Sequence, residues 1–419
     1  MSAAAPVAGA GRAALAFIFV TVVLDMLALG MVVPVLPRLI EDFLGGNTAG
    51  AARIYGVFGT VWALMQFLSM PVAGALSDRF GRRPVVLVSN FGRGFDYVLM
   101  ALAPNLAWLF VGRVISGITA ASISTAMAYI ADVTPVEKRS GAFGFIGVAF
   151  GVGFVLGPAI GGLLGSVDPR LPFWAAAALS LANACYGLFV LPESLPREKR
   201  RAFEWRRANP VGSFRLLRSH PELGGLAGVT FLSNVAHAAL PSTFVLYAGY
   251  RYGWDARAVG LAFAAVGVCS AVVQGTLVGP LTRRLGERRL MISGLLVGAA
   301  GFAAYALAPT GLLFMAAVPA VALWGVASPA AQALMSRRLG SSEQGALQGA
   351  NGAIMGVAMM VGPGLFTATF AYFIGDGARL HVPGAAYLLA AVMLASGALL
   401  AARVTARSEI GAARPVVHP

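Results

Sequence analysis

Charged residues are scarce in this sequence. Only 11% of its 419 residues are Asp, Glu, Lys or Arg, whereas 58% are hydrophobic. A soluble domain of this composition would not stay in solution, but a protein whose surface faces lipid requires such a balance. The shortage of charge therefore argues against a soluble domain and predicts a chain that crosses a bilayer several times.

Cysteine and histidine are also rare. The two cysteines, Cys185 and Cys269, lie in apolar runs, which argues against a disulfide framework or a metal cage. The four histidines are scattered, and no paired carboxylates accompany them as a catalytic cluster would need. No GxxxxGK[ST] loop is present, so ATP is not expected to be the direct energy source. We therefore expect no enzyme, no bound cofactor and no metal site.

The charges that are present are placed asymmetrically. A formal net charge of +14 would suggest a nucleic-acid partner in a soluble protein. Here most basic residues fall in alternate segments between apolar runs, and few fall on the opposite side: Arg38, Arg53, Arg170, Arg251, Arg257 and Arg379. Because Lys and Arg near span ends stay in the cytoplasm, this pattern predicts cytoplasmic termini, an even number of spans, and contact with anionic lipid rather than nucleic acid.

The apolar runs are each about long enough to cross ~30 Å of hydrocarbon as a helix. They lie near 13–36, 54–77, 84–103, 107–131, 140–165 and 172–191, and again near 223–248, 257–280, 289–308, 311–335, 345–374 and 384–404. We therefore predict an all-α membrane protein with twelve transmembrane helices in two pseudo-symmetric six-helix bundles, 1–191 and 223–419. The basic segment 192–222 is expected to be a cytoplasmic linker, and a regulatory binding site is the alternative.

Two motifs occur once in each half. The loop Gly74–Pro84 is repeated in part by Gly279–Arg289, and Gly157-Pro158 matches Gly362-Pro363 at nearly the same offset. A weak internal repeat is typical of transporters built from two related halves. Small residues let membrane helices approach closely and Gly-Pro permits a bend, although plain helix packing could explain any single glycine.

These motifs resemble those of the major facilitator superfamily, and within it the twelve-span drug:proton antiporters. The similar segments are Gly74–Pro84, Leu109–Gly117 and Gly151–Gly162. Further segments are similar to the tetracycline/proton antiporter group: Leu24–Pro37, Tyr55–Arg83, Asp96–Tyr97, Ala128–Asp132, Pro329–Ser336 and Gln344–Gly349. The resemblance covers nearly the whole chain.

The resemblance implies a proton-coupled exporter that works by alternating access in the bacterial cytoplasmic (inner) membrane, functional as a monomer. Tetracycline is the best single prediction of the substrate, and a divalent metal would enter only as part of the tetracycline complex. The alternatives are efflux of other amphiphilic drugs or metabolites and, less favoured, nutrient uptake. The Gly157-Pro158 motif argues against uptake because it is characteristic of the antiporters.

Four charged side chains lie deep inside the predicted spans: Asp25, Arg93, Asp96 and Arg113. A charge in hydrocarbon costs about 2.5–3.5 kcal/mol on insertion scales, so each needs a reason. The resemblance implies that Asp25, Asp96 and Arg113 face a central cavity and handle substrate or protons, and a purely structural buried pair is the alternative. Arg93 stands where the family has a small residue, and its spacing from Asp96 favours an ion pair along one helix.

The second half departs from the tetracycline group. Gly298 and Ser270 stand where the group carries an aspartate and a histidine, so we expect Gly298→Asp to strengthen transport of a metal–tetracycline complex. His237 could replace the lost titratable group because imidazole titrates near neutral pH, although a packed histidine is the alternative. Uncharged hydrogen-bonding residues are expected to line this half: Gln274, Gln332, Gln348 and Asn351.

The loop after the second span is expected to act as a cytoplasmic gate. Asp78 can accept hydrogen bonds from a helix N-terminus or pair with an arginine, latching the two halves, and a solvated acid is the alternative. The other expected gating residues are Arg79, Gly81, Arg82, Arg83, Asp132, Gly157 and Pro158, with Glu137 as a further partner. Arg283 stands at the position of Asp78 in the second repeat, so the latch is expected to be asymmetric.

Overall fold

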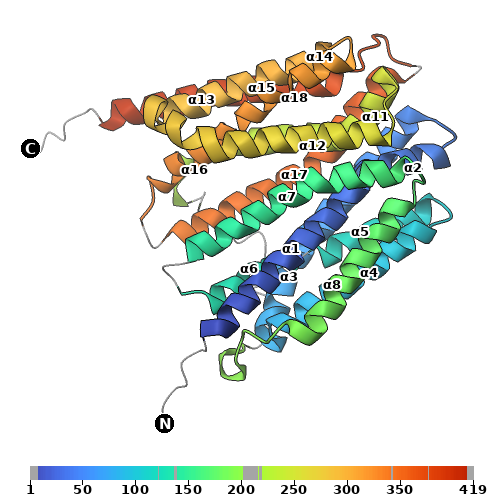
Figure 1. Ribbon diagram of the computed structural model, residues 1–419. Helices are drawn as coiled ribbons and strands as arrows, with labels where there is room; N and C mark the ends of the chain where they lie inside the picture. Colours follow the sequence, from blue (N-terminus) through green and yellow to red (C-terminus); the bar gives the residue numbers. More distant parts are fainter. Residues whose placement is uncertain are drawn as a thin grey trace, which may run out of the picture. The chain divides into compact units, whose positions relative to one another are not determined.

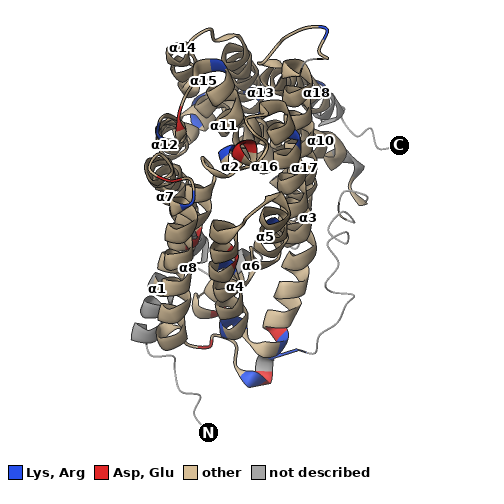
Figure 2. Ribbon diagram, turned by 90° about the vertical axis from the view of Figure 1, so that its right-hand side faces the viewer, with Lys and Arg blue, Asp and Glu red and all other residues tan. Residues whose placement is uncertain are grey.

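The structure, a computed structural model, describes residues 8–120, 122–135, 139–201, 216, 219–340, 343–375 and 377–412. Eleven helical stretches of this part are long and apolar enough to cross a membrane. One of them, Ala256–Leu307, has 52 residues. At 1.5 Å per residue it is about 78 Å long, enough for two crossings. The helices therefore agree with the predicted twelve spans, and Figure 2 shows long stretches of them without charge.

The helices follow the order of the apolar runs. The first half forms α1 (Ala8–Val32), α2 (Leu36–Phe43), α3 (Thr48–Phe80), α4 (Arg82–Leu102), α5 (Leu106–Thr119), α6 (Ser122–Val133), α7 (Arg139–Gly165), α8 (Leu171–Val190) and the short η2 (Arg197–Lys199). The second half forms α10 (Pro221–His237), α11 (Ala239–Tyr252), α12 (Ala256–Val272), η4 (Val273–Leu277), α13 (Val278–Leu307), α14 (Gly311–Ala316), α15 (Val318–Leu323), η5 (Trp324–Val326), α16 (Ala327–Ser336), α17 (Gln344–Ile374) and α18 (Ala385–Ala412).

Several predicted boundaries differ from the structure, and two of them flank the repeated loops. The span expected at 54–77 is the longer helix α3, and the polar segment after residue 280 is helical rather than a loop. Arginine, glutamate and leucine are good helix formers, so leaving the apolar region does not end a helix. The break comes instead at Gly286, whose φ of 73° and ψ of 160° lie outside the helical region.

Contacts divide the chain into two units. Unit 1 comprises 1–47, 61–210 and 254–264, and unit 2 comprises 48–60, 211–253 and 265–419. Each unit thus takes the first part of one long helix from the other half of the sequence. The predicted bundles, 1–191 and 223–419, remain a prediction about how the chain is organised.

Unit 1 is built around α1. This helix packs against α7 and α8, and α4 packs against α8, α5 and α6 (Figure 1). Glycines allow the closest approach: a Cβ added to Gly157 would lie 2.7 Å from the Cα of Gly30. The first part of α12 contacts another face of α7 through Gly260 and Gly162. The glycine-rich motif therefore packs α7 against two helices at once.

Unit 2 has an aromatic core. α13 packs against α18, α16 and α15, and Figure 1 labels α15 and α18 beside it. α10 packs against α18 and α17. Tyr305 and Phe314 stack with ring centroids 4.0 Å apart, and Tyr247 meets Tyr387 edge to face at 4.9 Å. Such pairs contribute about 0.5–1.5 kcal/mol each beyond the area they bury. At the start of α3, Thr60 donates a hydrogen bond to the Met360 carbonyl of α17 at 3.0 Å.

The two halves of the sequence repeat one local geometry at a spacing of 205 residues. Gly81 and Gly286 both have positive φ, 106° and 73°. Asn105 and Thr310 both accept a backbone hydrogen bond at the start of a helix, α5 and α14. The repeat recognised in the loops therefore extends to helix ends whose sequences do not look alike.

Candidate functional site

The charged cluster consists of Asp25, Arg93, Asp96 and Arg113, and it lies inside unit 1. Asp25 comes from α1, Arg93 and Asp96 from α4, and Arg113 from α5, and no more than 8% of the surface of any of them is exposed. Four buried charges in otherwise apolar spans are costly unless they compensate one another. The structure brings together the three first-half residues that the sequence singled out for transport, with Arg93 among them.

Arg93 forms its ion pair with Asp25. Its Nη1 lies 2.7 Å from Asp25 Oδ2, and its Nη2 donates to the carbonyl of Thr119 at 3.2 Å. The helical spacing had favoured Asp96 as the partner, but a side chain on α4 can also reach across to α1. The buried cation thus links α1, α4 and the last residue of α5.

Asp96 is held differently. Its polar neighbours are Arg113 and Ser116 on α5, with Arg93 on its own helix. Within the described part of the chain, neither carboxylate oxygen accepts a hydrogen bond of standard length and angle, although Ser116 lies nearby. A Cβ added to Gly112 would lie 3.1 Å from Asp96 Oδ1, so this glycine leaves room for the carboxylate against α5.

Arg113 lies over an aromatic ring. Its Cζ is 5.5 Å from the centre of the Trp62 ring on α3, within the range of a cation–π interaction. Gly117, one turn further along α5, permits this approach because a Cβ there would lie 2.6 Å from the Trp62 carbonyl oxygen. Sequence reasoning missed Trp62. A tryptophan in the middle of a span, away from either interface, is the signal that could have found it.

The loop network is formed by Asp78, Gly81, Arg82, Asp132 and Glu193 of unit 1. Arg82 lies at its centre: Nη1 is 2.6 Å from Asp78 Oδ1, and Nε is 3.0 Å from Asp132 Oδ2. The backbone N–H of Arg82 donates to Glu193 Oε1 at 2.9 Å. The network ties the ends of α3 and α6 to the segment after α8.

The other predicted gate residues lie around this network. Arg79 is exposed, with its guanidinium carbon 5.0 Å from the Phe80 ring centre, and Arg83 donates to the Leu188 carbonyl at 2.6 Å. Glu137 lies outside the described residues. Sequence reasoning missed Glu193, which comes from the start of the linker. The role of the network as a gate stays a prediction.

Unit 2 contains an ion pair at the positions equivalent to Arg82 and Asp132, with the acid and the arginine exchanged. Glu287 and Arg337 stand 205 residues after Arg82 and Asp132, and Arg337 Nη2 lies 2.6 Å from Glu287 Oε1. The repeat thus conserves the attraction between the two positions but reverses which helix supplies the cation.

The predicted polar residues of the second half divide into two groups. His237 and Gln274 lie near η5: the His237 ring is 5.7 Å from the Trp324 ring, and Gln274 lies beside Gly325. Gln332 and Gln348 are exposed, and Asn351 is buried with neither amide atom hydrogen-bonded to any residue that the structure describes. Gln274 sits in the π-helical turn η4, a feature often found at functional sites.

Gly298 is buried against Trp324. A Cβ at this position would lie 2.7 Å from the Cβ and Cγ of Trp324 and 3.0 Å from Cδ1 of Leu394. An aspartate side chain does not fit there without displacing the tryptophan. The structure therefore reverses the expectation that Gly298→Asp improves transport.

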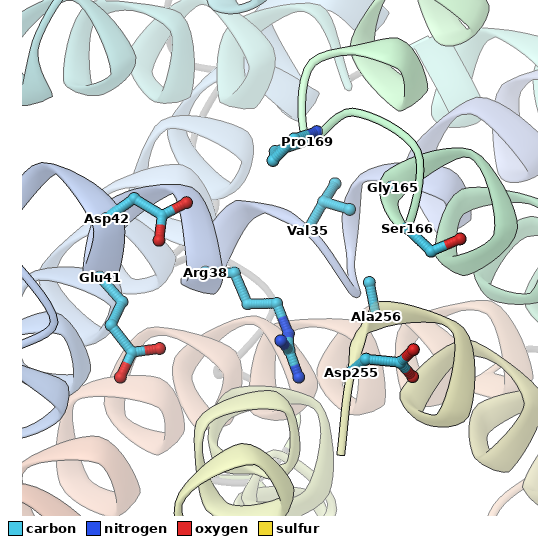
Figure 3. A pocket seen from close by; sticks show the side chains of 9 residues that line it. All are labelled: Val35, Arg38, Glu41, Asp42, Gly165, Ser166, Pro169, Asp255 and Ala256. Carbon is cyan, nitrogen blue, oxygen red and sulfur yellow. The ribbon is translucent and has the colours of Figure 1, made fainter. Parts of the chain in front are cut away.

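A pocket of about 260 Å³ lies in unit 1 beside α2 (Figure 3). Its lining residues are Val35, Arg38, Glu41, Asp42, Gly165, Ser166, Pro169, Asp255 and Ala256. Arg38 donates to the carbonyl of Trp254, and Figure 3 shows its guanidinium directed toward Asp255. The lining contains three carboxyl groups and one guanidinium, so its charge is predominantly negative.

Comparison with known proteins identifies the family. The sequence profile of the Major Facilitator Superfamily matches residues 18–363 and 226–417. The chain belongs to the Major Facilitator Superfamily. Its members are transporters, so the chain is a multi-pass membrane transporter and not an enzyme.

The most similar curated superfamily members include tetracycline resistance proteins. The class C protein of Escherichia coli is 40% identical over 387 residues, covering 92% of this chain and 97% of that protein. The class G protein of Vibrio anguillarum is 36% identical and covers 84% of this chain and 89% of that protein. The predicted resemblance to the tetracycline group is thereby confirmed, and the chain is related to tetracycline efflux proteins.

Solved superfamily structures share the fold. The nucleoside transporter NupG matches with a TM-score of 0.74 at 13% identity, covering 94% of this chain and 99% of that one. The human organic anion transporter MFSD10 matches with a TM-score of 0.68 at 24% identity, covering 93% and 99%. The predicted all-α major facilitator fold is confirmed.

Proposed function

We propose that this transporter exports a tetracycline-type drug in exchange for protons, by alternating access in the bacterial cytoplasmic membrane. It acts as a monomer, with both termini in the cytoplasm and its basic loops against anionic lipid. The observation that carries the proposal is the charged cluster, since buried acids and arginines in apolar spans are typical of proton-coupled transport. The kinship with tetracycline resistance proteins supports the choice of substrate.

Proton exchange requires a carboxyl group that changes its partner. In a low-dielectric site an arginine stabilises a carboxylate, and when that arginine is drawn away the carboxylate binds a proton and becomes neutral. Asp96 has Arg113 as a neighbour and Asp25 is paired with Arg93, so a substrate that binds among these charges would alter this balance. The charged cluster can therefore link a drug to a proton.

Alternating access requires helix contacts that separate at little cost. Within unit 1, Gly162 of α7 faces Ala256 and Gly260 of α12, and within unit 2, Gly59 of α3 faces Pro363 of α17. These contacts are made by small residues, so parting them exposes little surface. The glycine and proline motifs thus supply interfaces suited to repeated opening.

Inside-out vesicles from a bacterial host without its own tetracycline pumps test this proposal. Respiration acidifies their interior, so an exporter should accumulate tetracycline with Mg²⁺, and nigericin, which collapses the pH gradient, should abolish the accumulation. Vesicles without the protein are the control. Accumulation that survives nigericin, or net loss of drug on energisation, would contradict proton-coupled export.

A second candidate is efflux of another amphiphilic drug. It is favoured by Gly298, because residues 289–307 of α13, all of them described, contain no acid. Trp324 covers the position of Gly298. The same vesicles should then be tested with a panel of hydrophobic cations and neutral drugs. Gradient-dependent accumulation of one of these, with none of tetracycline, would select the second candidate.

A further inference from the structure

We infer that the two buried acids have different tasks: Arg93 holds Asp25 as a fixed ion pair, and Asp96, beside Arg113, is the group that binds and releases the transported proton. This inference rests on the proposed proton-coupled function. It assigns the proton carrier within the charged cluster and makes Arg93 a positioning residue.

The two side chains of the Arg93–Asp25 ion pair are both shielded from solvent. The 2.7 Å contact joins side chains that are 5% and 4% exposed, and Arg93 also donates to the Thr119 carbonyl. A proton on Asp25 would leave a buried guanidinium without its counter-charge, and removing one partner of a buried pair is far more costly than removing both. Asp25 is therefore expected to stay ionised throughout the transport cycle.

Asp96 can change its charge without stranding an arginine. Its neighbour Arg113 lies over the Trp62 ring, whose π face attracts a cation whether or not Asp96 is ionised. The Ser116 hydroxyl nearby can donate to a carboxylate or accept from a carboxylic acid. Gly112 lets the carboxyl group lie directly against the backbone of α5, since a Cβ there would be 3.1 Å from Asp96 Oδ1. These features suit a group that alternates between two protonation states.

Few other charges face Asp96. Its charged neighbours are Arg93 on its own helix and Arg113 on α5. Tyr97 also lies near these charges, and Asp25 is the partner of Arg93. Helices α6 and α8 also pack against α4, and their titratable residues are Tyr129, Asp132, Cys185 and Tyr186. Tyr129 donates to the Pro192 carbonyl, and Asp132 belongs to the loop network. Among the titratable groups around α4 that the structure describes, the choice of proton carrier thus falls between Asp25 and Asp96.

Proteoliposomes can separate the two acids. Uptake of tetracycline with Mg²⁺ is measured under an imposed pH gradient and in counterflow, which needs no net proton movement. For Asp96→Asn we expect gradient-driven uptake to fall at least about tenfold while counterflow persists. For the double variant Asp25→Asn with Arg93→Gln we expect a lower rate, but the gradient should still drive accumulation because the pair is removed as a whole.

A conservative pair of variants covers the case in which the double variant does not fold. Asp96→Glu should shift the pH dependence of uptake, whereas Asp25→Glu should leave it unchanged. The inference is overturned if Asp25→Glu shifts the profile and Asp96→Glu does not, or if Asp96→Asn still accumulates drug under the gradient. If the unmodified protein transports without a gradient effect, the proposed function fails, which is a different result from a wrong proton carrier.

Discussion

Replacing Gly81 by alanine should destabilise the protein more than the same change at its repeat partner, Gly286. Both residues have backbone angles that are essentially restricted to glycine, with φ/ψ of 106°/162° and 73°/160°. Their surroundings differ. A Cβ at Gly81 would lie 2.7 Å from Cδ of Glu193, whereas a Cβ at Gly286 would meet no atom of the described residues within 4 Å.

The magnitudes follow from these geometries. Backbone strain of this kind costs about 1–3 kcal/mol at either position. At Gly81 the Glu193 carboxylate must also move away from the backbone N–H groups of Arg82 and Leu195, at 2.9 and 3.0 Å. Because Glu193 is partly exposed, water replaces some of this interaction, and we assign the loss about 1–3 kcal/mol. Gly81→Ala should therefore cost about 2–6 kcal/mol in total.

Thermal unfolding of the purified protein in detergent, followed by size-exclusion chromatography, measures this difference. The midpoint should fall in the order unmodified protein, Gly286→Ala, Gly81→Ala. In a Glu193→Ala background the added effect of Gly81→Ala should shrink to that of Gly286→Ala, since only strain remains. Equal effects of the two alanines in the unmodified background would refute the reasoning.

Three further predictions can be checked by measuring the yield of folded protein and its unfolding midpoint. Gly157→Val should cost about 1–3 kcal/mol by overpacking the backbone of α1. Gly151→Val on the same helix should be nearly neutral, because no atom of the described residues lies within 4 Å of a Cβ there. A larger effect at Gly151 would contradict the packing. Arg82→Gln should cost about 1.5–3 kcal/mol because two acids lose their partner. Arg337→Gln should cost about 0–1 kcal/mol because the Arg337 side chain is 74% exposed. The opposite ranking would be inconsistent with the burial of the two arginines. Gly298→Asp should lower folded yield and tetracycline resistance, and increased resistance would show that the site has room for the acid.

The sequence predicted the helices well because one property determines them. The length of each apolar run must match the bilayer, so the spans could be placed from hydropathy alone. It predicted their ends less well. The arginine-rich segment after residue 280 looked like a loop, yet its residues are good helix formers and the chain stays helical up to Gly286.

The charged cluster was predicted as a set of residues but not as a set of contacts. Any acid inside a span is visible in the sequence. The partner of Arg93 is not visible there, since spacing along one helix favours Asp96, whereas the folded chain brings Asp25 of α1 within 2.7 Å of Arg93. The surroundings of Gly298 were hidden for the same reason, because Trp324 comes from another helix.

The most direct test of the central claim is the movement of protons when drug is added. Proteoliposomes containing a pH-sensitive dye, without an imposed gradient, should show a substrate-induced pH change for the unmodified protein and none for Asp96→Asn. Drug movement without any pH change, or an unaltered pH change in Asp96→Asn, would contradict the account.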